Sequence, residues 1–157
     1  MGDNDIQTNF TRTYLGCTSI ISQGKRETMV ELARESILVM DDDKDILNLF
    51  KDTLEEEGYK VVAVSTGRDA VTRAQEEQIH VAILDIIMHD VTGDSVAFEL
   101  KRINELIKII FISGYSRIQD SINALGLGVS EILIKPVTAE ELLHAVKLAL
   151  LTPPIPK

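Results

Sequence analysis

The chain has 157 residues, of which 45% are apolar and 26% are charged, and its formal net charge is -9. This length allows one domain with a hydrophobic core plus an extension, and the composition is that of a globular protein, not a disordered or fibrous one. The acidic balance argues against a nucleic-acid partner or an anionic membrane surface, because both need clustered Lys and Arg.

The residues that report on cellular location favour the cytoplasm. Cys17 is the only cysteine, so no intrachain disulfide can form, and a reducing compartment is the default. The N-terminus lacks a basic-then-apolar signal pattern, and no apolar run reaches the length of a membrane span. We therefore expect a cytoplasmic protein without a membrane contact.

The chain divides by composition into three parts. Residues 1–35 are polar and lack a strong period, so we expect an N-terminal extension that is flexible or carries a short helix. Residues 36–151 show a regular alternation of apolar runs and helical periods, as one domain should. The tail over residues 152–157, TPPIPK, cannot continue a helix because its prolines lack N–H donors.

Short aliphatic runs predict the strands of this domain. Each run is nearly continuous in Val, Ile and Leu, which is typical of a parallel sheet covered on both faces. The runs cover residues 36–40, 60–64, 80–84, 108–112 and 131–134.

Segments with a helical period lie between and after these runs, over residues 45–58, 66–78, 94–105, 118–128 and 138–151. The first carries an apolar stripe made of Ile46, Leu49, Phe50 and Leu54. Gly58 follows it where a helix end favours a left-handed residue, and Thr138 and Glu141 have the spacing of a capping box. Strand and helix thus alternate, and right-handed crossovers fold such a chain into an open α/β sheet with helices on both faces.

Polar residues stand at the carboxyl ends of four predicted strands. Asp41 and Asp42 follow the first, Asp85 the third, Ser113 the fourth and Lys135 the fifth. Ligands of open α/β sheets bind at these ends, where the strand order reverses. If the order is 2-1-3-4-5, the three aspartates converge and need a cation, for which Mg²⁺ is favoured. The hydroxyl and the ammonium would complete a phosphoryl-binding set.

Four segments, in this order, resemble the receiver domain of two-component response regulators. They are ILVMDDDKDILNLF, AILDIIMHDVTGD, FISGYS and EILIKPVTAEELL. The resemblance covers roughly residues 36–151. It implies a flavodoxin-like (βα)5 fold, a three-layer sandwich around a five-stranded parallel sheet of order 2-1-3-4-5.

The resemblance also implies the roles of the strand-end residues. Asp85 would be the phosphoacceptor, which takes a phosphoryl group from a histidine kinase or a phosphotransfer protein. Ser113 would donate a hydrogen bond to the new phosphoryl group, and Lys135 would pair with another of its oxygens.

The same resemblance implies Mg²⁺ as the cofactor. Its ligands would be Asp42, Asp85 and the backbone carbonyl of Ile87, and Asp41 would act through water. The domain would catalyse its own phosphorylation and dephosphorylation, yet it would act mainly as a signalling switch and not as a metabolic enzyme.

The expected partners are the phosphodonor and a downstream protein target, and a phosphorylation-dependent dimer is left open. The sequence does not choose among a stand-alone regulator, the receiver module of a hybrid kinase and a phosphorelay intermediate without its own output. The alternative class is a Mg²⁺-dependent aspartyl phosphohydrolase of the haloacid-dehalogenase type. That class wants a second Asp two residues after the nucleophile, where this chain has Ile87.

The chain departs from the family pattern at several positions, one of which is Gly114, where alanine is frequent. His89 stands where proline is usual, four residues after Asp85, and Thr92 stands where aspartate is common. Ile132 stands three residues before Lys135, where many receivers carry Tyr or Phe. These positions affect the loop beside the acceptor and the route by which a signal leaves the site.

Overall fold

A computed structural model describes residues 34–89, 91–115 and 126–153. The N-terminal extension up to residue 33, most of the helix predicted over 118–128 and residues 154–157 lie outside the described residues.

The described strands form one parallel sheet in the order β2-β1-β3-β4-β5, which confirms the predicted topology. The strands are β1 (Ser36–Met40), β2 (Lys60–Val64), β3 (Val81–Asp85), β4 (Lys108–Ser113) and β5 (Glu131–Ile134). Met40 pairs with both Val64 and Leu84. The ends of β1 and β3 therefore lie side by side at one edge of the sheet.

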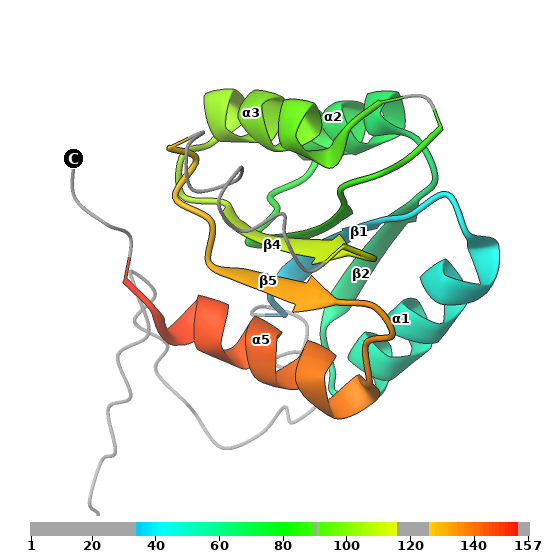
Figure 1. The fold of residues 1–157 in the computed structure, drawn as a ribbon. Coiled ribbons are helices and arrows are strands. Elements are labelled where there is room, and N and C mark those ends of the chain that lie inside the picture. Colours follow the sequence, from blue (N-terminus) through cyan, green and yellow to red (C-terminus); the bar gives the residue numbers. More distant parts are fainter. Residues whose placement is uncertain (1–33, 90, 116–125, 154–157) are drawn as a thin grey trace, which may run out of the picture. The chain divides into compact units, whose positions relative to one another are not determined.

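The described helices are α1 (Lys44–Glu56), α2 (Gly67–Glu76), α3 (Gly93–Ile103) and α5 (Ala139–Leu151). Helices α2 and α3 cover one face of the sheet, and α1 and α5 cover the other (Figure 1). This arrangement confirms the three-layer sandwich. None of the helices in the described part of the chain is long and apolar enough to cross a membrane.

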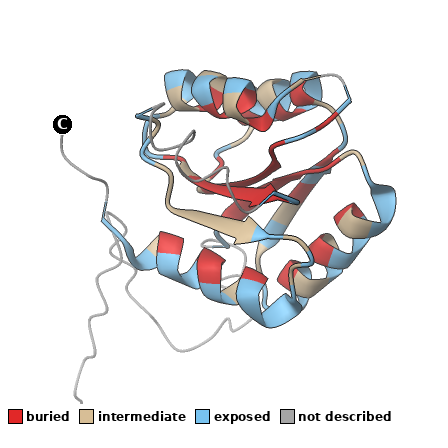
Figure 2. Ribbon diagram, in the orientation of Figure 1, coloured by how far each residue is buried: buried red, intermediate tan, exposed pale blue. Residues whose placement is uncertain are grey.

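The hydrophobic core is split by the sheet into two halves. Ile37 and Val39 pack with residues of α1 and α5, whereas Leu38 and Met40 pack with residues of α2 and α3. Alternate side chains of a strand point to opposite faces, so both sets must be apolar. This two-sided burial explains the continuous aliphatic runs, and Figure 2 shows buried central strands between half-buried helices, with the edge strand β5 only partly buried.

The buried stripe of α1 differs from the predicted one at two positions, Leu47 and Leu49. Leu47, Phe50 and Leu54 are buried, whereas Leu49 is 58% exposed, so its assignment to the buried stripe was wrong. An α-helix turns by about 100° per residue, which puts Leu49 about 160° away from Leu47 around the axis. The face that packs on the sheet is the one centred on Leu47, Phe50 and Leu54.

Gly58 has a φ of 93°, which confirms the left-handed residue predicted after the first helix, and side chains cap two other helix ends. Asp43 caps α1 by accepting hydrogen bonds from the backbone N–H groups of Asp45 and Ile46. Thr138 and Glu141 form the predicted capping box of α5. Two helices that begin at the carboxyl edge of the sheet are thus fixed by side chains beside the candidate site.

Candidate functional site

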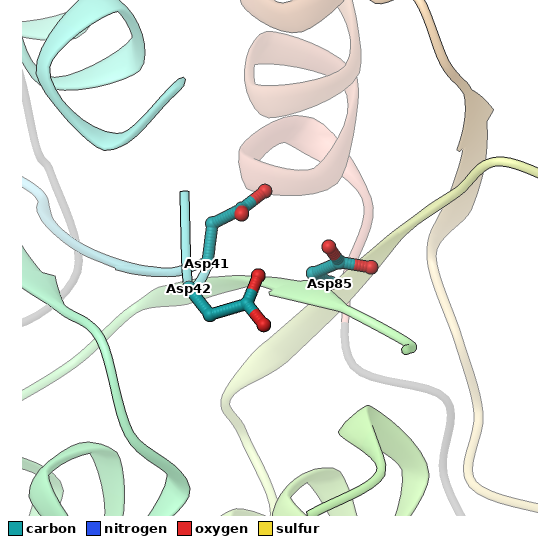
Figure 3. A group of neighbouring side chains, drawn as sticks. All are labelled: Asp41, Asp42 and Asp85. Carbon is teal, nitrogen blue, oxygen red and sulfur yellow. The ribbon is translucent and has the colours of Figure 1, made fainter. Parts of the chain in front are cut away.

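Three carboxylates meet at the carboxyl edge of the sheet. Asp41 follows β1 directly, Asp42 comes next, and Asp85 is the last residue of β3. One carboxylate oxygen of each lies within 4.8 Å of the others (Figure 3). Asp41 is 2% exposed and Asp85 is 6% exposed. The convergence expected from the strand order is therefore present, and two of its three members are buried.

Lys135, the residue after β5, reaches two of these carboxylates. Its Nζ atom lies 3.1 Å from Oδ2 of Asp41 and 2.7 Å from Oδ2 of Asp85. Burial lowers the pKa of Lys135, but its hydrogen bonds to Asp85 and Asp41 outweigh burial and raise that pKa above the ordinary value. Lys135 therefore remains an ammonium that bridges the two buried carboxylates.

The ionised form of Asp41 remains disfavoured although Lys135 lies beside it. Burial raises the pKa of Asp41 above its ordinary value, although the backbone N–H of Asp43 and the ammonium of Lys135 both lower it. The nearby charge of Asp85 raises it further. One ammonium balances one of the three carboxylate charges, so the site retains an excess of negative charge. An all-oxygen donor set with this charge fits a hard divalent cation such as Mg²⁺.

The loop after Asp85 folds back tightly against it. The backbone N–H of Ile87 donates to Oδ1 of Asp85 at 3.1 Å, and the N–H of Gly93 donates to the carbonyl of Ile86 at 2.9 Å. A Cβ atom at Gly93 would lie 2.4 Å from the Asp85 carbonyl oxygen, so only glycine fits. The structure thus shows Ile87 in contact through its N–H, and the use of its carbonyl as a metal ligand stays a prediction.

His89 contacts the third carboxylate. Its backbone N–H donates to Oδ2 of Asp42 at 3.3 Å, and its ring Nδ1 contacts the same oxygen. The side-chain contact is the main reason why the pKa of Asp42 lies below its ordinary value. The sequence placed His89 in the loop beside the acceptor, as a departure from the family pattern, but no spacing rule could have predicted this contact.

Ser113 lies on the strand next to Asp85, but its hydrogen bonds go elsewhere. Ile112 is the partner of Asp85 in the β3–β4 pairing, and Ser113 follows as the last residue of β4. The fully buried Ser113 hydroxyl accepts from the Tyr115 N–H at 3.0 Å and lies 3.4 Å from the Tyr115 carbonyl. The sheet brings Ser113 to the edge of the site, where its hydroxyl closes a local turn.

Comparison with known sequences identifies response regulators among the relatives of this chain. The model of the response regulator receiver domain family matches residues 37–147. The response regulator SaeR of Staphylococcus aureus (strain USA300) is 33% identical over 106 residues, which are 68% of this chain and 46% of SaeR. The chain therefore spans about half the length of the curated relatives that it matches.

Solved structures give the same result. The CheY-like receiver domain protein of Methanospirillum hungatei JF-1 superposes with a TM-score of 0.70 at 30% identity, over 75% of this chain and 94% of that chain. TrrA of Thermotoga maritima, solved in complex with Mg(2+)-BeF, superposes with a TM-score of 0.67 at 31% identity, over 74% of this chain and 99% of that chain. With its fold, its strand-end carboxylates and these relatives, the chain belongs to the response regulator receiver domain family of two-component systems.

Proposed function

We propose that this protein is a phosphorylation switch in which Asp85 accepts a phosphoryl group from a histidine kinase or a phosphotransfer protein in the cytoplasm. The observation that carries the proposal is the bridge from Lys135 to Asp41 and Asp85 within a group of three converging carboxylates. Membership in the receiver family favours this function over the aspartyl phosphohydrolase considered from the sequence.

Phosphoryl transfer needs little covalent chemistry from the protein, which mainly positions the reacting groups and stabilises charge. The P–N bond of a phosphohistidine breaks, a P–O bond to an Asp85 carboxylate oxygen forms, and the imidazole leaves with one proton from water. The ammonium of Lys135 lies 2.7 Å from Oδ2 of Asp85 and donates a charge-assisted hydrogen bond to that carboxylate. Asp85 is therefore a nucleophile from which no base has to remove a proton.

Asp42 and Asp85 would hold Mg²⁺ directly, together with the Ile87 carbonyl, and Asp41 would act through water. The fit rests on the oxygen donors, which lie within 4.8 Å of one another, and on the two carboxylate charges that Lys135 leaves unbalanced. When bound, Mg²⁺ neutralises charge on the phosphoryl group during transfer.

Lys135 and Ser113 would respond to the new phosphoryl group. Lys135 would exchange one of its carboxylate contacts for a phosphoryl oxygen, which is a strong charge-assisted partner. The Ser113 hydroxyl lies 3.4 Å from the Tyr115 carbonyl, a long contact that the hydroxyl can give up to donate to a phosphoryl oxygen. Tyr115 is 65% exposed, so a change in this turn reaches the surface. Contacts with a downstream protein or a second copy of the chain would then change.

The proposal is tested by phosphorylation with acetyl phosphate, followed by intact-protein mass spectrometry. The parent should gain one phosphoryl group in Mg²⁺ and none in EDTA. Asp85→Asn should gain none in either buffer, whereas the control Asp45→Asn, at an exposed position of α1, should behave as the parent. Labelling of Asp85→Asn, or labelling of the parent without a divalent cation, would show that the assignment is wrong.

A further inference from the structure

Each of the three carboxylates is held by a different set of hydrogen bonds. Asp41 accepts from the Asp43 N–H and from Lys135, and Asp85 accepts from the Ile87 N–H and from Lys135. Asp42 is the most exposed of the three side chains, at 27%. In the described part of the chain, the hydrogen bonds that other residues give to its carboxylate come from one residue, His89.

Both contacts of His89 end on the same oxygen of Asp42. The backbone N–H and the ring Nδ1 each approach Oδ2. An ionised carboxylate only accepts hydrogen bonds, so Nδ1 carries the proton and donates it. His89 does not belong to the set of mutually close donor atoms formed by the three aspartates. It therefore holds Asp42 from outside the cluster, and both of its contacts are with Oδ2.

We infer that His89 is a positioning residue for Asp42, which fixes the carboxylate through Oδ2 so that Oδ1 is presented to the cation. The inference rests on the proposed function, because it concerns the Mg²⁺ site assigned there. Mutation of a residue that hydrogen-bonds to a metal ligand usually weakens metal binding 10- to 100-fold. The His89 side chain is 97% exposed, so water competes for the same oxygen, and we expect an effect of about 3- to 10-fold.

The test is the Mg²⁺ affinity of three variants, measured by isothermal titration calorimetry with magnesium chloride. His89→Ala should weaken binding by about 3- to 10-fold. His89→Asn should restore binding to within about twofold of the parent, because an asparagine amide can donate from nearly the position of the ring Nδ1. His144→Ala, at an exposed position of α5, should bind as the parent does.

Several outcomes would overturn the inference. Equal affinity of His89→Ala and the parent would show that the ring does not position Asp42, and tighter binding would show that the ring competes with the cation. Failure of His89→Asn to restore binding would assign the loss to a changed loop. A lower melting temperature of His89→Ala in EDTA would give His89 a structural role instead.

A variant of the ligand itself separates this inference from the proposed function. Asp42→Asn should weaken Mg²⁺ binding far more than His89→Ala does, because it removes a charge that the cation needs. If the parent does not bind Mg²⁺, or if Asp42→Asn binds as the parent does, the proposed site is wrong. If Asp42→Asn loses binding while His89→Ala retains it, only the role of His89 is wrong.

Discussion

The two ends of the central strands are built in opposite ways. At the amino end, the Ser36 N–H donates to Nδ1 of His80, and the N–H groups of His80 and Lys108 donate to the carbonyls of Ser36 and His80, each at 2.9 Å. At the carboxyl end, Asp41 and Asp85 are buried and share one ammonium, that of Lys135. One end is closed by neutral hydrogen bonds, and the other keeps unbalanced charge.

This difference separates stability from function along the same strands. Neutral hydrogen bonds contribute about 1 kcal/mol each to stability, and groups that are already paired in this way offer little binding energy to a ligand. Buried charges are costly to desolvate, and a cation or a phosphoryl group changes their energy strongly. One buried group at the amino end, the Ser36 hydroxyl, has no hydrogen-bond partner among the described residues. We therefore expect changes at the amino end to lower stability alone, and changes at the carboxyl end to alter both stability and binding.

Lys135→Ala should have the largest effect on stability, because it leaves Asp41 and Asp85 buried without their cation. Breaking a buried ion pair costs about 3–5 kcal/mol, and we expect about 2–3 kcal/mol because the Lys135 side chain is 28% exposed. Mg²⁺ should restore most of this loss and bind more tightly than in the parent, since a divalent cation can replace the ammonium.

Urea unfolding in EDTA and in Mg²⁺ measures both quantities for Lys135→Ala. Lys51→Ala is the control, because Lys51 forms an exposed pair with Glu55 at 4.0 Å and should contribute less than about 0.5 kcal/mol. A Lys135→Ala protein that is as stable as the parent in EDTA would show that the ion pairs do not hold the carboxyl end.

His80→Ala should destabilise the protein by about 1–2 kcal/mol, because it leaves the backbone N–H of Ser36 without its acceptor in a buried position. Labelling by acetyl phosphate should be unchanged. The matched control is His144→Ala, which should stay within about 0.5 kcal/mol of the parent because His144 is exposed. Loss of labelling in a folded His80→Ala protein would show that the amino end also affects phosphorylation.

Asp41→Asn should have the smallest effect on stability, and it should stabilise the protein where the other two substitutions destabilise it. Folding raises the pKa of Asp41 from 3.8, so the folded state binds this proton more tightly, and stability falls as pH rises through the raised pKa. At neutral pH the full penalty is present, and its removal should stabilise the protein by about 1 kcal/mol. The gain over the parent should shrink as pH falls toward 3.8, where Asp41 is protonated in the folded state.

Thermal and urea unfolding across this pH range measure the gain of Asp41→Asn. Asp52→Asn is the charge-matched control on the exposed face of α1, and its stability should stay within about 0.5 kcal/mol of the parent at every pH. If Asp41→Asn is less stable than the parent at neutral pH, the hydrogen bonds to Asp43 and Lys135 outweigh burial, and the carboxyl end is not strained.

The strands and the charged cluster could be predicted from the sequence for a common reason. Two-sided burial makes the middle of a central strand apolar, so the first charged residue after an aliphatic run marks the strand end, as Asp41 does after Met40. Once the order of the strands is fixed by right-handed crossovers, their ends must meet. This rule accounts for Asp41 and Asp85, whereas Lys135 was marked by the short aliphatic run of the edge strand β5 that precedes it.

The remaining contacts depend on turns, for which the sequence carries no period. The contact of His89 with Asp42 requires the loop that Gly93 closes against Asp85, and the turn of Ser113 with Tyr115 is equally local. The error at Leu49 has a related cause, because a helical period indicates an apolar face without deciding how the helix is rotated on the sheet.

The most direct test of the central claim is to locate the phosphorylated residue chemically. Borohydride reduces an aspartyl phosphate to homoserine, and digestion followed by tandem mass spectrometry then finds the position of the reduced residue. After labelling with acetyl phosphate in Mg²⁺, Asp85 should be reduced and no other aspartate should be. Reduction at Asp41 or Asp42, or a labelled protein that borohydride does not reduce, would contradict this prediction.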